Sequence, residues 1–169
     1  MGSPATKPSL ESTLQRIWTR RGAGAWLLLP LSLLYVALST FRRLLYRTGI
    51  LPIHRIRVPV IVVGNVIAGG AGKTPTTIAI VQHLQSQGHR VGVISRGYGR
   101  KSQNIQEVFA DAAPELAGDE PLLIQRKTSV PVFVAHTRYQ AAQALLARYP
   151  DTELIVCDDG LQHFSLYRD

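Results

Sequence analysis

The chain has 169 residues, 46% of them hydrophobic, which is enough for one domain with a hydrophobic core. Its single cysteine excludes an internal disulfide framework and fits a reducing compartment. Residues 1–60 carry nine of the 19 Lys and Arg residues and one acid, so the whole net charge of +8 lies there and residues 61–169 are neutral overall. This distribution argues against a nucleic-acid partner and predicts contact with an anionic membrane surface.

Residues 22–41 form an uncharged segment of 20 residues, which is long enough to cross a bilayer. Pro30 should kink a helix here, and basic residues at both ends leave the orientation undefined. The sequence favours a helix lying in the membrane interface; a bilayer-spanning helix and a helix buried in a protein core are the open alternatives. We therefore assign residues 1–57 to a basic, hydrophobic, membrane-associating segment and residues 58–169 to a separate core domain.

Beyond residue 58, short apolar runs alternate with helical stretches, which is typical of an α/β domain with a parallel sheet. Pro131 should move its strand to an edge of the sheet or mark the start of the strand. Cys157 reads as a small buried hydrophobic side chain. The predicted strands are residues 60–63, 91–94, 130–134 and 153–157, and the predicted helices are residues 74–87, a helix from about 119, and 137–148.

A glycine-rich loop joins the first of these strands to the first helix. Backbone N–H groups of such a loop surround an anion at the positive end of the helix, and a lysine adds a charge to the β- and γ-phosphates. The sequence therefore predicts a P-loop that binds a nucleoside triphosphate with Mg²⁺, with the Thr74 hydroxyl on the cation. Ile67 stands where the usual spacing has glycine. The loop consists of Gly69, Gly70, Ala71, Gly72, Lys73 and Thr74.

Two groups of acidic residues fit phosphoryl transfer. Asp158 and Asp159 follow the last buried strand, where P-loop enzymes carry a carboxylate that holds Mg²⁺, although Asp-Asp-Gly is also a common turn. Asp119 precedes Pro121 at a helix start. There it would act either as an N-cap, the reading that the residues alone favour, or as a carboxylate that accepts a hydroxyl proton.

Basic and aromatic residues follow the second strand, at the same edge of the sheet as the P-loop. Arg96 and Tyr98 stand among glycines there, and the segment reads either as a loop that binds an anionic sugar or as an exposed basic turn. Gln162 and His163, after the acidic pair, are further candidates for hydrogen bonds to a substrate.

With these motifs in order, the chain resembles the tetraacyldisaccharide 4'-kinases of lipid A biosynthesis. The resemblance extends from the N-terminal hydrophobic segment to the last residue, and the unusual P-loop spacing fits the family's own loop. The motifs that carry it are Val63-Gly64-Asn65-Val66 with the P-loop and Pro75, Ile94-Ser95-Arg96-Gly97-Tyr98-Gly99, Gly118-Asp119-Glu120-Pro121, and Asp158-Asp159-Gly160-Leu161-Gln162-His163.

The resemblance implies a P-loop NTPase-like kinase on the cytoplasmic face of the inner membrane, which phosphorylates the 4'-hydroxyl of a tetraacyl glucosamine disaccharide 1-phosphate. It implies that Asp119 is the catalytic base and that Asp158 and Asp159 form the Mg²⁺ site. It assigns the lipid-linked substrate to the region of Arg96, Tyr98, Gln162 and His163. Family members are longer than this chain, so the histidine that pairs with the catalytic base is expected after residue 169.

Two other functions fit part of the pattern. Membrane-bound regulatory P-loop ATPases share Gly-Gly-x-Gly-Lys-Thr, but they carry a lysine immediately before the first glycine, where this chain has Ala68. An inactive nucleotide-binding fragment is the second alternative, because the chain is shorter than the family. Turnover with a lipid acceptor would distinguish the kinase from both.

Overall fold

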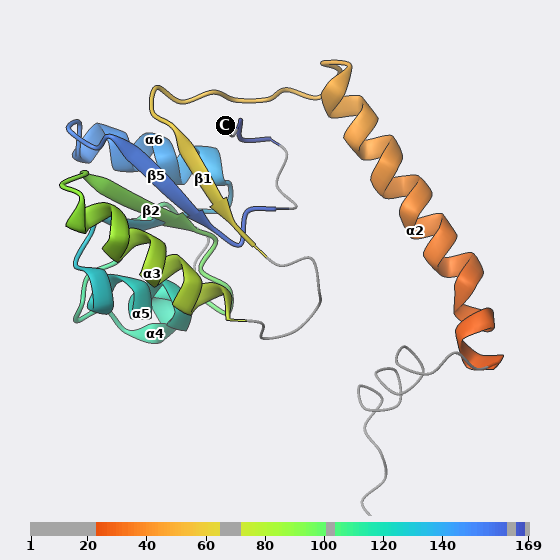
Figure 1. Ribbon diagram of the computed structural model, residues 1–169, viewed down its shortest axis with the longest axis horizontal. Coiled ribbons are helices and arrows are strands. Elements are labelled where there is room, and N and C mark those ends of the chain that lie inside the picture. Colours follow the sequence, from red (N-terminus) through yellow and green to blue (C-terminus); the bar gives the residue numbers. More distant parts are fainter. Residues whose placement is uncertain (1–22, 65–71, 101–103, 162–164, 168–169) are drawn as a thin grey trace, which may run out of the picture. The chain divides into compact units, whose positions relative to one another are not determined.

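The computed structural model describes residues 23–64, 72–100, 104–161 and 165–167 (Figure 1). The chain divides into two units that meet at Ile50 and Leu51, and each unit is described here by itself. The expected boundary at residues 57 and 58 stays a prediction. Among the described residues, no helix has both the length and the apolar character needed to cross a bilayer.

The first unit contains one long helix, α2 (Ala23–Arg47), of 25 residues. Pro30 lies inside α2 and does not end it. Large apolar side chains along α2 are exposed, including Trp26 at 74% and Tyr35 at 67%. Among the described residues of this unit, these apolar side chains of α2 therefore stay exposed, and contiguous exposed apolar surface of this kind often marks a contact site for a protein or a membrane.

The second unit is built on a five-stranded sheet in the order β1-β5-β2-β4-β3. The four longer strands are parallel, as predicted, but β3 runs antiparallel to β4, so the sheet is mixed. The sequence did not indicate β3 because it has two residues and no apolar run. The strands are β1 (Val60–Val63), β2 (Val91–Ser95), β3 (Gln106–Glu107), β4 (Val132–Val134) and β5 (Leu154–Asp158).

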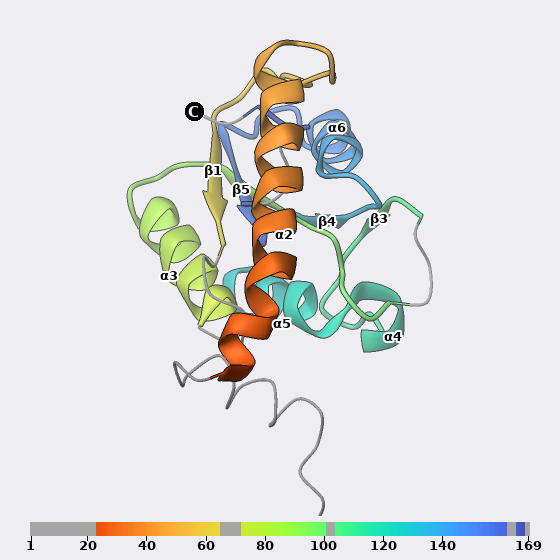
Figure 2. The same cartoon turned by 90° about the vertical axis from the view of Figure 1, so that its right-hand side faces the viewer.

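Helices cover both faces of the sheet (Figure 2). α3 and α5 pack on one face and α6 on the other, and the predicted helix positions are confirmed. α4 is a single turn that the sequence did not indicate. Pro131 precedes β4, so it marks a strand start; the edge alternative is wrong, since β4 lies between β2 and β3. The helices are α3 (Lys73–Ser86), α4 (Pro114–Ala117), α5 (Asp119–Thr128) and α6 (Arg138–Arg148).

Alternating side chains of the strands form two separate cores. Val93 and Val156 face α3 and α5, whereas Ile94 and Ile155 face α6, and all four are fully buried. Cys157 belongs to the α6 core and is 1% exposed, which confirms its reading as a buried small side chain. Burial of each of these branched side chains contributes about 1.5–3 kcal/mol to the free energy of folding. The two cores therefore fix the positions of the strands whose carboxyl ends carry the candidate site.

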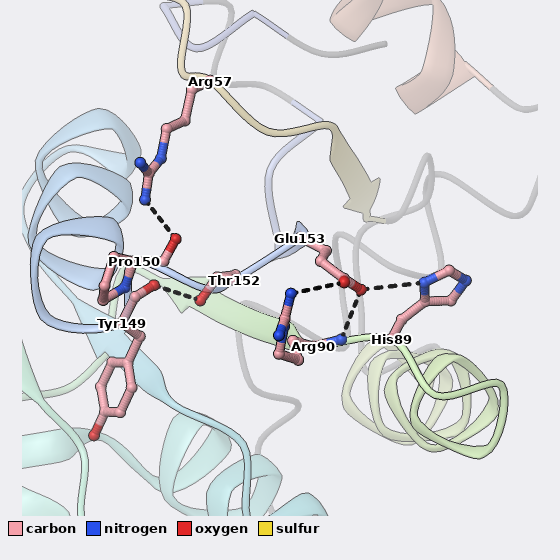
Figure 3. A network of polar contacts seen from close by, with 7 residues as sticks. All are labelled: Arg57, His89, Arg90, Tyr149, Pro150, Thr152 and Glu153. Carbon is pink, nitrogen blue, oxygen red and sulfur yellow. Dashed lines mark hydrogen bonds and ion pairs between the residues drawn. The ribbon is translucent and has the colours of Figure 1, made fainter.

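A polar network joins the amino ends of β2 and β5, at the edge opposite the P-loop (Figure 3). Glu153 accepts from the backbone N–H of Arg90 at 3.1 Å and from the Arg90 guanidinium at 3.0 Å, and it pairs with His89 at 3.4 Å. The backbone hydrogen bond from Arg90 is the main reason that the pKa of Glu153 is lowered. This network connects the amino ends of β2 and β5, whereas the candidate functional residues lie at the carboxyl ends of the strands.

Candidate active site

The P-loop lysine meets the second acid of the predicted pair. Lys73 begins α3, directly after the left-handed Gly72 (φ 73°), and Asp159 follows β5. The distance from Lys73 Nζ to Asp159 Oδ1 is 2.7 Å, although the residues lie 86 positions apart in sequence. The hydrogen bond that Lys73 donates to Asp159 is the main cause that raises the pKa of Lys73, so the lysine is a full cation at the start of α3.

Asp158, the last residue of β5, is 1% exposed and has one oxygen engaged and one not. Thr77, which is fully buried on α3, donates its hydroxyl to Asp158 Oδ1 at 2.9 Å. Asp158 Oδ2 is buried and has no hydrogen-bond partner among the described residues. Burial raises the pKa of Asp158, and the Thr77 hydrogen bond opposes that rise. A buried polar atom without a hydrogen-bond partner is uncommon in folded proteins, and a carboxylate oxygen in this state fits the ligand of a cation.

Glu120 is a third acid at this site, and the sequence argument did not single it out. Its charge contributes to raising the pKa of both Lys73 and Asp158, so it lies near them although it belongs to α5. Its position one residue after Asp119 was the available signal. The pairing of α3 with α5, which brings it close, was not visible in the sequence.

These acids fit a cation that is held partly by the protein. In the described parts of the chain, no three His, Cys, Asp or Glu side chains converge into a complete metal cage. Mg²⁺ does not need one, because it is usually bound by one or two carboxylates together with substrate phosphates. Asp158 Oδ2, which has no hydrogen-bond partner among the described residues, could supply one such ligand, beside the lysine that would meet the phosphates.

Asp119 does not cap its helix, which corrects the reading that the residues alone favoured. α5 begins at Asp119 itself, and the N-cap position belongs to Gly118, which has no side chain to cap with. The Asp119 side chain is exposed and has no hydrogen-bond or ion-pair partner among the described residues. The helix starts at Asp119 because Gly118, with φ 87°, makes the turn that leads into it.

The basic loop after β2 packs against the start of α5 through two glycines. A Cβ placed on Gly118 would lie 3.1 Å from the Gly97 Cα, and one on Gly97 would lie 2.9 Å from the carbonyl oxygen of Ala117. This contact brings Arg96 and Tyr98 to the same region as Asp119. Both side chains are exposed, and Tyr98 is 87% exposed.

The structure brings together only part of the predicted site. Lys73, Asp158 and Asp159 converge, whereas Thr74 lies buried in the first turn of α3 and makes no hydrogen bond to the acids among the described residues. The remaining predicted residues lie outside the described parts of the chain: Gly69, Gly70, Ala71, Gln162 and His163.

The chain is similar in sequence and fold to known proteins. The family model for Tetraacyldisaccharide-1-P 4'-kinase matches residues 24–169. Tetraacyldisaccharide 4'-kinases of Acidovorax sp. (strain JS42) and Polaromonas naphthalenivorans (strain CJ2) are 57% and 54% identical over 169 and 160 residues. These alignments cover 100% and 95% of this chain but 50% and 47% of the relatives, so the chain spans about half the length of the curated relatives it matches.

A solved structure of LpxK from Aquifex aeolicus in complex with ATP has the same fold. Its TM-score is 0.75 at 38% sequence identity, and the match covers 83% of this chain and 45% of that one. The sequence match runs through all four motifs and the fold match extends over most of the chain. The chain therefore belongs to the tetraacyldisaccharide 4'-kinase family.

Proposed function

We propose that this chain supplies the nucleotide-binding half of an ATP-dependent kinase, which transfers the γ-phosphate to the 4'-hydroxyl of a tetraacyl glucosamine disaccharide 1-phosphate in lipid A biosynthesis. The observation that carries the proposal is the meeting of Lys73 with Asp159, beside a buried Asp158 oxygen that has no donor among the described residues. Membership of the family supports the choice of reaction.

Phosphate binding would fall to the start of α3. The backbone N–H groups of the loop and the positive end of the helix favour an anion, and Lys73 adds a point charge. Thr74, Asp158, Asp159 and Glu120 are the oxygen donors available for Mg²⁺, which would neutralise charge on the phosphates when bound. The Thr77 hydroxyl keeps Asp158 Oδ1 occupied and so directs the other oxygen, Oδ2, to that task.

Phosphoryl transfer requires one proton to leave the acceptor. The 4'-hydroxyl oxygen would form a bond to the γ-phosphorus while the bond from that phosphorus to the bridging oxygen of ADP breaks. Asp119 would accept the hydroxyl proton; its carboxylate is exposed at the start of α5 and does not cap the helix, which supports this role. We assign the anionic sugar to Arg96 and Tyr98, which the glycine contact holds near Asp119, and to Gln162 and His163.

The test of nucleotide binding is calorimetry with Mg²⁺ and ATP. Lys73→Ala removes the charge nearest the β- and γ-phosphates and also leaves Asp159 without its partner, so we expect binding to be lost. Lys127→Ala, on the last turn of α5, removes the same charge elsewhere in the core unit and should bind as the unsubstituted chain does. Equal affinity in the Lys73 variant would refute the P-loop assignment.

We further propose that α2 associates with an anionic membrane, at the cytoplasmic face of the inner membrane. Its apolar side chains are exposed, and Arg42, Arg43 and Arg47 lie at its carboxyl end. Juxtamembrane basic residues contribute about 1 kcal/mol each near an anionic surface. Removal of residues 1–47 should abolish sedimentation with anionic vesicles, and neutral vesicles serve as the control for charge. Equal sedimentation of the shortened chain would contradict the proposal.

A further inference from the structure

Arg138 lies beneath the acidic pair, and the reaction proposed above does not use it. It is the first residue of α6 and is 2% exposed. Its Nη2 donates to the carbonyl oxygen of Asp159 at 2.9 Å and, at the longer distance of 3.4 Å, to that of Asp158. One nitrogen therefore holds two successive carbonyl groups, at the point where the chain leaves β5.

The turn that Arg138 holds has an uncommon backbone conformation. Asp159 has φ 53°, in the left-handed region that costs a residue with a side chain roughly 1–2 kcal/mol. Gly160 follows and donates its N–H to the carbonyl oxygen of Val63 in β1 at 3.2 Å. The turn is therefore fixed by Arg138 at two carbonyls and by β1 at the next amide. In this conformation the Asp159 side chain reaches Lys73, while Asp158 stays directed at Thr77.

Stability alone does not explain a buried arginine at this position. Its Nε and Nη1 are buried and have no hydrogen-bond partner among the described residues. A buried charge is costly to remove from water, and even buried ion pairs can often be replaced by well-packed apolar residues without loss of stability. An apolar side chain would lack the hydrogen-bond donor that Arg138 shares between the carbonyl groups of Asp158 and Asp159.

We propose that Arg138 is a positioning residue, which holds the Asp158–Asp159 turn and thereby sets the orientation of the two carboxylates toward the cation and the phosphates. The identity of what the carboxylates hold rests on the proposed function. The role of Arg138 in fixing the turn does not rest on the proposed function, so the conformation of the turn and the binding by the carboxylates are tested by separate measurements.

Two variants separate geometry from packing. Arg138→Met keeps much of the length of the side chain and removes every donor, whereas Arg138→Lys keeps the charge and offers a single ammonium group. Thr128→Val is the matched control: Thr128 is 6% exposed, and its hydroxyl bonds only the carbonyl oxygen of Ile124 in its own helix at 2.7 Å. The control removes a buried hydrogen bond of the core without touching the turn.

Amide hydrogen exchange at Gly160, followed by NMR in the 169-residue chain, reports the turn without any ligand. In Arg138→Met we expect the Gly160 amide to exchange at least about ten-fold faster than in the unsubstituted chain, with the exchange rates of the β2 and α5 amides unchanged. Calorimetry with a non-hydrolysable ATP analogue at varied Mg²⁺ then reports the carboxylates. Loss of a group that orients metal ligands typically lowers metal affinity about 10–100-fold, so Arg138→Met should need at least ten-fold more Mg²⁺ and Arg138→Lys an intermediate amount.

Each outcome decides one of the two proposals. Unchanged exchange at Gly160 in Arg138→Met overturns the positioning role. A uniform rise in exchange over the whole core, as in a destabilised Thr128→Val, also overturns it, because the arginine would then be merely structural. If Arg138→Met does not fold, the Arg138→Lys variant decides in the same way, since it retains the buried charge. If the unsubstituted chain binds no nucleotide at any Mg²⁺ concentration, the proposed function fails, and Gly160 exchange still decides the role of Arg138.

Discussion

Replacement of Thr77 by valine tests the electrostatics of the acidic pair most directly. Valine has nearly the shape of threonine, so the fully buried site keeps its packing and loses only the hydroxyl that donates to Asp158 Oδ1 at 2.9 Å. A hydrogen bond to a charged group contributes about 1.5–3 kcal/mol to stability, and one between neutral groups about 0.5–1.5 kcal/mol. The cost of Thr77→Val therefore depends on whether Asp158 is ionised.

The sign of the pH dependence follows from the pKa of Asp158. Burial raises that pKa above the ordinary value of 3.8. A carboxyl group whose pKa is raised by folding stabilises the fold fully below its unfolded pKa, and this contribution is lost as the pH rises through the folded pKa. Removal of the Thr77 hydroxyl raises the pKa of Asp158 further. The destabilisation by Thr77→Val should thus be largest at neutral pH, about 1.5–3 kcal/mol, and decline toward about 0.5–1.5 kcal/mol as Asp158 takes up its proton.

The assay is urea unfolding of both chains, from neutral pH down to the most acid pH at which the unsubstituted chain stays folded. Thr128→Val is the control, because its hydroxyl bonds a backbone carbonyl group and its cost should not change with pH. A cost of Thr77→Val that is equally independent of pH would refute the reasoning, since Asp158 would then not be an ionised acceptor.

Two further predictions concern the start of α5. In a chain extended to the length of its relatives, Asp119→Asn should lower turnover by about 10²–10⁴-fold and leave the melting temperature unchanged, because Asp119 caps nothing; unchanged turnover would remove it as the base. Gly118→Ala should lower the free energy of unfolding more than Gly88→Ala does in urea titrations. Both glycines have positive φ, of 87° and 86°, but only a Cβ at Gly118 meets backbone atoms, at 3.1–3.2 Å. Equal costs would contradict the close contact with Gly97.

The sequence predicted most of the core unit because its local signals agree with one another. A continuous β-branched run predicted β1 and a short, mostly β-branched run predicted β2, and the strand that ends at Asp158 put the acidic pair at the correct edge of the sheet. The P-loop motif then predicted that the acidic pair would lie near the lysine at the start of α3. β3 was not predicted, because a two-residue strand is defined by its pairing with β4 and carries no pattern of its own.

The residues that the sequence argument missed reach the site through packing. Thr77 and Glu120 come from two different helices, and Arg138 from a third on the opposite face of the sheet. Helical spacing alone does not show which face of a helix points to a site. Arg55 and Arg57 were counted with the membrane-facing charges, but Arg55 lies 4.0 Å from the ring centre of Tyr167 and Arg57 donates to the carbonyl oxygen of Pro150 at 2.7 Å.

The ion pair between Lys73 and Asp159 occupies the group that would bind a phosphate with the group that would bind a cation. A phosphate that draws Lys73 away leaves Asp159 uncompensated beside two more acids, and a cation that attracts Asp159 releases Lys73 for the phosphate. When one of the two ligands has broken the ion pair, the other ligand no longer has to break it in order to bind. By thermodynamic linkage, the gain is the same in both directions. Under the proposed function, the chain would therefore bind a cation and a phosphate cooperatively, and each one alone more weakly.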